Sequence, residues 1–404
     1  MVQPRMKPQL RFAPIIAAAF LLAITFFPKE ASAYAWMIRH GYTGCTSCHA
    51  DPSGGALLTR YGRAQSELLL RTRYGSERKV QEPGSMGDFL FGAFNVPDSL
   101  LLGGDVRNLL LNVIPQNGPS MTKFIVMQAD AQAEFRVDRF RVNGSLGYAR
   151  DGALAASITS GPHDRLISRT FWAGVDLGSD NQFLLRAGRM NLPFGIRSIE
   201  HTLWARTSTR TDVNASQQYG VALAYGIENF RAEVMAIAGN FQARPDAFRE
   251  RGYSGYAEYA PTLHSAVGVS SLVAHADRDI YSNAELLRQS HGLFARYSPV
   301  MQVVLSAEAD ALVQSQPSSP TLVGHTGYVQ GDYEFIQGVH LIGTGEWLQA
   351  APTRADPSVG LWGSVAWFFA PHADVRLDTI WRSAATSAAR SQSTALLAQF
   401  HLFL

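Results

Sequence analysis

The sequence predicts an all-β protein: an antiparallel transmembrane β-barrel of about 16 strands with a small N-terminal c-type haem segment plugging its lumen. Three observations lead to this prediction. Apolar and polar residues alternate with a period of two from about residue 98 onward. The connections between the alternating stretches are short and long in turn. The residues before them lack this pattern and contain Cys45-Thr46-Ser47-Cys48-His49.

The alternation separates an apolar face from a wet face. In the stretch Gln128–Val137, one face carries Gln, Asp, Gln, Glu and Arg, and the other carries Ala, Ala, Ala, Phe and Val. The same pattern recurs within 303–313, 329–335 and 374–382. Such strands are typical of a barrel whose exterior meets lipid and whose interior meets water. The alternative is a soluble protein of two packed sheets, which has no reason to alternate short and long connections.

About 16 such stretches can be counted, each close to the length that a tilted strand needs to cross a bilayer. They start near residues 100, 121, 139, 167, 181, 216, 228, 252, 262, 288, 300, 321, 337, 357, 372 and 393. Long connections are expected at roughly 150–166, 190–215, 239–251, 275–287, 314–320, 350–356 and 384–392. Short periplasmic turns and long external loops are the layout of an outer-membrane barrel. We therefore expect a protein of the bacterial outer membrane, in contact with its lipid.

Aromatic residues and the last strand favour the same fold. Aromatic side chains gather beside the short turns, as in the interfacial girdles of such barrels; they are Tyr225, Phe230, Tyr259, Tyr297, Phe335 and Phe369. The last stretch alternates through Leu396, Ala398, Phe400, Leu402 and Leu404. An amphipathic final strand of this kind is what the outer-membrane assembly machinery recognises.

The first 33 residues predict export and divide the chain into three parts. Arg5, Lys7 and Arg11 precede an apolar run over 12–27, and Ala31-Ser32-Ala33 is an A-x-A cleavage site. This is the pattern of a secretory signal peptide, with a signal anchor as the alternative. We therefore expect a signal peptide at 1–33, a monohaem segment at 34–97 and a barrel at 98–404. The formal net charge of +2 gives no reason to expect a nucleic-acid partner.

Cys45-x-x-Cys48-His49 has the spacing of a c-type haem attachment site. Two thiols three positions apart can each add to one vinyl group on the same porphyrin edge, and the adjacent imidazole then ligates the iron. The chain has 2 cysteines, both in this motif. A redox disulfide and half of a zinc site are the alternatives, but zinc needs two further ligands at matched spacing. The sequence therefore predicts one covalent haem c held by Cys45, Cys48 and His49.

The sixth ligand of the iron has four candidates, which are Met86, Met37, His40 and Met121. A methionine ligand would raise the reduction potential relative to histidine. Met86 lies between glycines in Gly84-Ser85-Met86-Gly87, although an ordinary loop methionine is the alternative. We also expect a short helix within Ala56–Arg73 that packs on a face of the porphyrin.

Two stretches around the motif resemble the fused monohaem cytochrome–porins of the bacterial outer membrane, a family best known for iron-oxidising bacteria. They are Ile38-Arg39-His40-Gly41-Tyr42-Thr43-Gly44 and Leu58-Thr59-Arg60-Tyr61-Gly62-Arg63. The remaining chain is similar in architecture, with a weaker likeness to porins at 188–195. The resemblance implies a haem inside the barrel mouth that passes electrons between an extracellular donor or acceptor and a periplasmic c-type cytochrome. His40 and Gly41 replace the family's polar pair, so the resemblance does not identify the electron donor. Fe(II) is one of the donors that the resemblance suggests.

Three functions compete at this point. The first is electron transfer across the outer membrane, with Fe(II) oxidation as the one enzymatic activity implied. The second is a diffusion porin whose haem segment is a non-conducting plug or sensor, and the third is a soluble periplasmic haem enzyme. The sequence shows no Ser-His-Asp set, phosphate loop or carboxylate pair.

The charged residues on the wet faces and one long loop leave further alternatives. The charges either steer ions or anchor the plug through ion pairs, or they simply wet the lumen. These charged residues are Asp130, Glu134, Glu258, Glu308, Asp310, Asp332, Glu334, Glu346, Arg136, Arg186, Arg231, Arg376 and Arg382. The loop at 190–215 carries Arg197, Arg206 and Arg210 and either folds into the barrel or lies outside it.

Overall fold

The computed structural model describes residues 34–74, 88–148, 165–200, 202–241, 245–317, 319–350, 357–385 and 389–404. The predicted signal peptide and the ligand candidate Met86 lie outside these ranges. None of the described helices is both long and apolar enough to cross a membrane.

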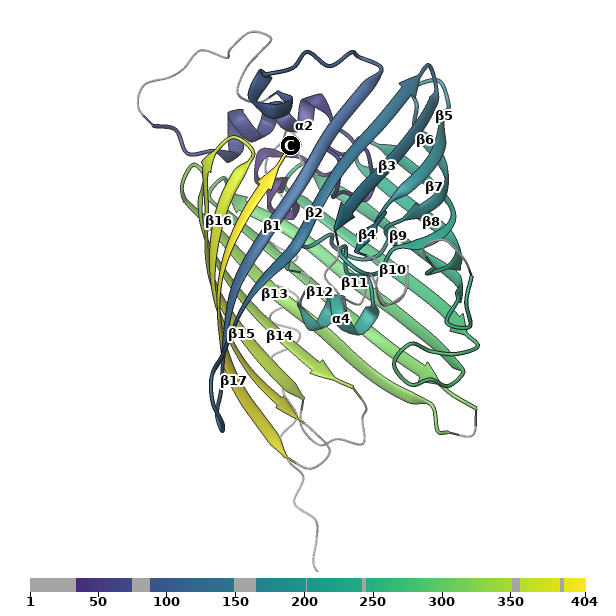
Figure 1. The fold of residues 1–404 in the computed structure, drawn as a ribbon, viewed down its shortest axis with the longest axis vertical. Coiled ribbons are helices and arrows are strands. Elements are labelled where there is room, and N and C mark those ends of the chain that lie inside the picture. The colour runs from purple at the N-terminus through teal and green to yellow at the C-terminus, as the bar shows by residue number, and fades with distance from the viewer. Residues whose placement is uncertain are drawn as a thin grey trace, which may run out of the picture.

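The strands form one closed antiparallel barrel, because β1 pairs with β2 on one side and with β17 on the other. They are β1 (Leu100–Pro115), β2 (Met121–Val137), β3 (Phe140–Tyr148), β4 (Leu166–Ile167), β5 (Phe171–Leu177), β6 (Phe183–Met190), β7 (Gln218–Ile227), β8 (Phe230–Gly239), β9 (Glu250–Thr262), β10 (Ser265–Ala276), β11 (Leu286–Val300), β12 (Val303–Ser315), β13 (Leu322–Ile336), β14 (Val339–Gln349), β15 (Ser358–Ala370), β16 (Ala373–Ala385) and β17 (Arg390–Phe403). Both β4 and β5 pair with β3, so the wall has 16 strand positions. The predicted 16-stranded barrel is confirmed (Figure 1).

The prediction of one continuous strand from residue 167 is wrong. The structure divides the fourth strand position into β4 and β5. The ladder is interrupted between β4 and β5, where the carbonyl oxygen of Thr170 accepts a hydrogen bond from the Ser145 amide at 2.8 Å. Arg169 lies within this interruption, is buried, and pairs with Asp130 on β2. A period-two pattern does not reveal such an interruption, because it depends on a contact with another strand.

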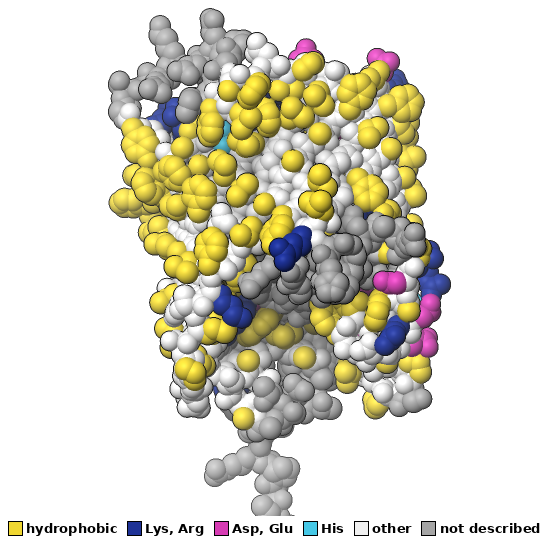
Figure 2. Space-filling view, in the orientation of Figure 1, with side chains coloured by type: hydrophobic (Ala, Val, Ile, Leu, Met, Phe, Trp, Pro, Cys, Tyr) yellow, Lys and Arg dark blue, Asp and Glu magenta, His cyan; other side chains and the backbone are white. Residues whose placement is uncertain are grey.

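The two faces of the wall differ as the alternation predicts. On β12, Ser306, Glu308 and Asp310 are buried inside the barrel, whereas Leu305 is 42% exposed outside it. Hydrophobic side chains cover most of the upper half of the face shown in Figure 2, where the charged groups lie near the top edge, and further charged groups lie in its lower half. Aromatic rings follow one another around the short-turn end, for example Tyr225 beside Phe183 with 4.7 Å between ring centroids. This exterior suits a bilayer core bounded by interfaces.

The residues 34–74, called the N-terminal segment here, lie inside the short-turn end of the barrel, close to the C-terminus (Figure 1). The segment contains the 3₁₀ helix η1 (Ala35–His40), the helix α2 (Arg60–Gln65) and the further helical turn η2 (Ser66–Leu70). A 3₁₀ turn, η3 (Phe89–Gly92), precedes β1. The helical residues 60–70 lie within Ala56–Arg73, where a short helix is expected, and the helix begins at Arg60 because Thr59 caps it by accepting a hydrogen bond from the Gly62 amide at 3.0 Å.

The loop between β6 and β7 also enters the lumen, and its described residues 191–200 and 202–217 are called the inward loop here. It contains the helix α4 (Trp204–Thr209), which contacts β12, β13 and β14 from inside. Two buried apolar clusters hold the loop, one around Leu192 and Phe194 and one around Leu203 and Ala205. The choice between an inward and an external loop is thus decided in favour of the lumen.

Candidate functional site

The Cys45-x-x-Cys48-His49 motif forms one helical turn. The amides of Cys48 and His49 both donate to the carbonyl oxygen of Cys45, at 3.2 and 2.9 Å. Side chains three and four positions apart on such a turn share one face. Both thiols are buried, and no disulfide joins them. The turn therefore has the local geometry that attachment of a porphyrin requires.

Residues 58–63, the second stretch that resembles the cytochrome–porins, contact this turn directly. The Thr59 amide donates to the carbonyl oxygen of Cys48 at 2.9 Å, and the Thr59 hydroxyl donates to that of Ser47 at 2.7 Å. A Cβ added at Gly62 would overlap the Cys48 carbonyl oxygen and lie 2.9 Å from the Cys48 Cα. Glycine at position 62 is thus required for α2 to approach the turn this closely.

A cavity of about 1150 Å³ lies beside the turn, inside the barrel. Cys48, His49 and Met37 line it from the N-terminal segment, together with Leu58. This volume includes space that is open to solvent. Cys45 is not among the lining residues, and its Sγ lies 3.0 Å from Nη1 of Arg231.

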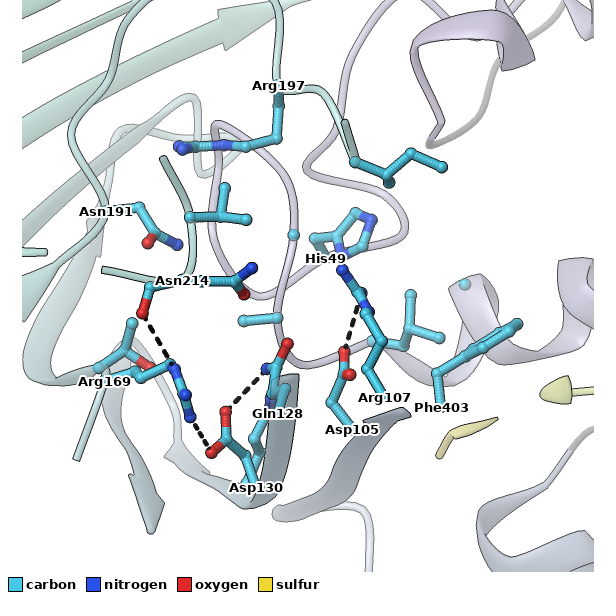
Figure 3. A pocket seen from close by; sticks show the side chains of 18 of the residues that line it. His49, Asp105, Arg107, Gln128, Asp130, Arg169, Asn191, Arg197, Asn214 and Phe403 are labelled. Atoms are coloured by element: carbon cyan, nitrogen blue, oxygen red, sulfur yellow. Dashed lines mark hydrogen bonds and ion pairs between the residues drawn. The ribbon is translucent and has the colours of Figure 1, made fainter. Parts of the chain in front are cut away.

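The opposite side of the cavity is built by the barrel wall and the inward loop (Figure 3). Its polar lining includes Arg107 on β1, Gln128 and Asp130 on β2, and Arg169 between β4 and β5. Arg197 of the inward loop reaches the same space. Sequence reasoning missed Arg107 and Arg169 because nothing in a single strand marks which wet-face residue will meet the N-terminal segment.

Buried ion pairs anchor the N-terminal segment to the wall. Arg39 is fully buried and pairs with Asp332 and, at 3.0 Å, with Glu334 on β13. Asp51 lies 3.4 Å from Arg186 on β6. Burial opposes ionisation of Asp51, but the charges of Arg186 and Arg197 outweigh it and hold the pKa of this carboxyl below its ordinary value.

The inward loop is anchored in the same way. Glu308 on β12 accepts a hydrogen bond from the Ile196 amide at 2.8 Å and pairs with Arg206. Glu200 pairs with Arg376 on β16 at 2.7 Å. Burial would raise the pKa of Glu200, but the Arg376 guanidinium lowers it below its ordinary value. Wet-face charges that were open to three interpretations thus serve here as anchors for both lumen elements.

The four candidates for the sixth ligand lie in different places. Met37 is buried and lines the cavity with His49. His40 is not among the lining residues, and Met121 is 46% exposed where β2 begins at the long-loop end. Met86 lies outside the described residues. The structure therefore brings one of the four, Met37, to the space beside His49.

His401 on β17 also lines the cavity and was not anticipated from the sequence. Its Nδ1 lies 2.9 Å from a carboxylate oxygen of Asp374, and its Nε2 lies 3.3 Å from one of Asp105. Because carboxylates engage both ring nitrogens, His401 is not offered to an iron atom in this arrangement. Among the described residues, no group of three or more His, Cys, Asp or Glu side chains is placed to hold a bare metal ion.

Comparisons with known proteins identify the barrel fold. No family model and no curated protein matches the chain. OmpT of Vibrio cholerae matches with a TM-score of 0.57 at 13% identity, over 76% of this chain and 99% of that one. The anion-selective porin of Comamonas acidovorans matches with a TM-score of 0.58 at 11% identity, over 76% and 99%. OprB of Pseudomonas putida matches with a TM-score of 0.55 at 8% identity, over 76% and 94%.

The fold is that of an outer-membrane porin. The prediction of an outer-membrane barrel is confirmed. At these identities the likeness establishes the fold alone. About a quarter of this chain has no counterpart in those porins, since they are matched almost completely by 76% of it.

Proposed function

We propose that this protein transfers electrons across the bacterial outer membrane, between an extracellular donor or acceptor and a periplasmic c-type cytochrome. A single haem c, attached at Cys45 and Cys48 and ligated by His49, is the carrier. The observation that supports the proposal is the position of the Cys45–His49 turn, which borders a cavity of about 1150 Å³ inside a closed barrel.

The residues around the cavity fit a porphyrin. The helical turn brings Cys48 and His49 to the cavity with Cys45 one turn earlier, and Gly62 allows α2 to pack on the turn without a side chain between them. Leu58, Leu70 and Phe403 contribute apolar surface, and Met37 supplies a thioether on the same cavity. When bound, haem c supplies a one-electron iron couple whose potential depends on its axial ligands and its surroundings.

The location of the site supports transfer rather than storage of electrons. Short turns of bacterial outer-membrane barrels face the periplasm, and the N-terminal segment lies at the short-turn end. A periplasmic partner would approach from this side. The segment and the inward loop both occupy the lumen, and Asn191 and Arg197 of the inward loop line the same cavity.

A diffusion channel is the second candidate function. The structural neighbours favour it, since they include an anion-selective porin and another outer-membrane protein. The ion-paired elements inside the lumen favour the first candidate, because each of them obstructs the path of a solute. In the first function electrons cross the membrane, and in the second function solutes cross it.

The test places the purified protein in liposomes that enclose a redox dye. We expect the wild type to keep a haem stain after denaturing electrophoresis and to bleach the enclosed dye when reductant is added outside. The matched control is Cys45→Ser with Cys48→Ser, which should fold into the same heat-modifiable barrel but lose both signals. Absence of haem from the wild type, or equal bleaching by the double variant, would overturn the proposal. A large haem-independent ion conductance would favour the channel.

A further inference from the structure

We propose that Arg107 and Arg197 form a receptor for two carboxylates, which are the two propionate groups of the haem. This inference rests on the proposed haem site and specifies how the lumen orients the group. The two arginines come from different parts of the chain, Arg107 from β1 and Arg197 from the inward loop, and both line the cavity that His49 borders (Figure 3).

Arg107 is a buried cation whose ion pair with Asp105 is loose. Its side chain is 9% exposed, and its nearest carboxylate oxygen, on Asp105, is 3.7 Å away, beyond hydrogen-bond distance. Its other contact is with Nε2 of His401 at 3.4 Å. Its Nε is buried and has no hydrogen-bond partner among the described residues. A buried guanidinium in this condition is costly unless an anion joins it.

The carboxylate of Asp105 contacts His401 as well as Arg107. Asp105 therefore does not neutralise the charge of Arg107 fully. Nε2 of His401 lies 3.3 Å from Oδ1 of Asp105, closer than the guanidinium of Arg107 comes to Oδ2. The five N–H donors of an arginine form a fork that suits a carboxylate. An additional carboxylate in the cavity would therefore satisfy donors that the wall leaves without close partners.

Arg197 is directed to neutral acceptors. It donates to the hydroxyl and the carbonyl oxygen of Ser53 and to the carbonyl oxygen of Leu192 at 3.3 Å. These contacts hold the side chain between the N-terminal segment and the inward loop, and Asp51, the carboxyl whose pKa Arg197 helps to lower, is not among the residues that line the cavity. A carboxylate at this point would join the two lumen elements through one group.

Arg169 lies in the same cavity and, unlike Arg107 and Arg197, is closely paired with a carboxylate. It pairs closely with Asp130, and its Nε donates to the carbonyl oxygen of Asn214 at 3.2 Å. The cavity lining thus contains 3 arginines and 2 aspartates, an excess of one positive charge with the histidines neutral. The excess lies with Arg107 and Arg197, which is why we assign the propionates to them and not to Arg169.

The test measures the midpoint potential and the propionate vibrations of the attached haem in Arg107→Gln and Arg197→Gln. A cation beside a propionate favours the reduced haem, because reduction removes one positive charge. We expect each variant to lower the ratio of reduced to oxidised haem about tenfold at a fixed potential, which corresponds to a fall of about 59 mV for a one-electron couple. The propionate bending modes in resonance Raman spectra should shift in the same variants.

Two controls separate charge at the propionate from charge or folding in general. Arg107→Lys keeps the charge but not the fork, so most of the potential should return while the Raman modes remain altered. Arg251→Gln removes an arginine paired with Asp277 in an exposed position, and it should leave potential and spectrum unchanged. Heat-modifiable migration verifies that each variant forms the barrel.

The outcomes are distinguishable from failure of the proposed function. A wild-type protein without covalent haem overturns the proposed function itself. Haem attached normally, with potential and propionate modes unchanged in both glutamine variants, overturns the receptor alone. A shift in potential without any shift of the propionate modes also overturns it, because the arginines would then act only through their distance-dependent field.

Discussion

The N-terminal segment and the inward loop occupy the same lumen but differ in what they leave open. The inward loop fills its space: Leu192 and Phe194 pack into one apolar cluster, and Leu203 and Ala205 pack into another. The N-terminal segment packs Trp36 and Ile38 against the wall yet leaves a large cavity beside His49. The comparison teaches that the inward loop lines one side of the cavity, whereas the N-terminal segment carries the Cys45–His49 turn on the other.

Both elements use the same kind of anchor, so removing an anchor should release one element and not the other. Arg39→Ala leaves Asp332 and Glu334 without their buried cation, which should cost about 3–5 kcal/mol. We expect the N-terminal segment to become cleavable by added protease while the barrel stays heat-modifiable. Arg60→Ala is the control: its pair with Asp98 is exposed and should contribute at most about 1 kcal/mol. Equal protection in both variants would contradict the anchoring role.

The corresponding change in the inward loop is Glu308→Gln. This removes the charge that pairs with Arg206, while an amide oxygen remains near the Ile196 amide. Loss of a charged hydrogen bond should cost about 1.5–3 kcal/mol. We expect single-channel conductance in planar bilayers to rise, with haem content unchanged. Conductance like that of the wild type would show that the loop does not limit the lumen.

One methyl group added at position 62 should disturb the Cys45–His49 turn. Gly62→Ala forces a Cβ against the Cys48 carbonyl, and overpacking of this kind costs about 1–3 kcal/mol. We expect haem incorporation to fall several-fold in the stained gel, with the barrel intact. Gly343→Ala is the matched control, since a Cβ there meets nothing within 4 Å. Full haem content in Gly62→Ala would mean that α2 can move away from the turn.

The smallest expected effect is the response of the inward loop to acid. The pKa of Glu200 is lowered in the folded protein, so its contribution to stability is fully present above the ordinary glutamate value of about 4.3. It is lost as the pH falls from there through the folded pKa. Conductance should therefore rise reversibly on acidification below about pH 4.3 in the wild type. Glu200→Gln should weaken this response, and an unchanged pH profile would exclude Glu200 as its source.

The wall could be predicted from the sequence to within a few residues. The expected starts near 252, 300 and 393 compare with observed starts at Glu250, Val303 and Arg390. This succeeds because the period-two alternation and the aromatic strand ends are local properties of the chain. The interruption at 168–170 was not predictable, since it depends on a partner 39 positions away in the case of Arg169 and Asp130.

The contents of the lumen were much harder to predict. The Cys45–His49 motif identified the turn, but the partners of Arg39 lie 293 and 295 positions away in the chain. Arg107 and His401 meet only because β1 pairs with β17. A periodic pattern states which face a residue occupies; it does not state the angular position around the barrel, and that position decides the contacts.

The pairing of β1 with β17 makes the first and last strands of the wall into a seam, and this seam crosses the cavity. Arg107 stands on one side of it, and His401 and Phe403 stand on the other. A Cβ at Gly103 would lie 2.8 Å from the Leu404 carbonyl oxygen and 2.5 Å from Leu57 of the N-terminal segment, so the segment presses directly on this junction. Closure of the barrel at this junction therefore also completes one wall of the cavity.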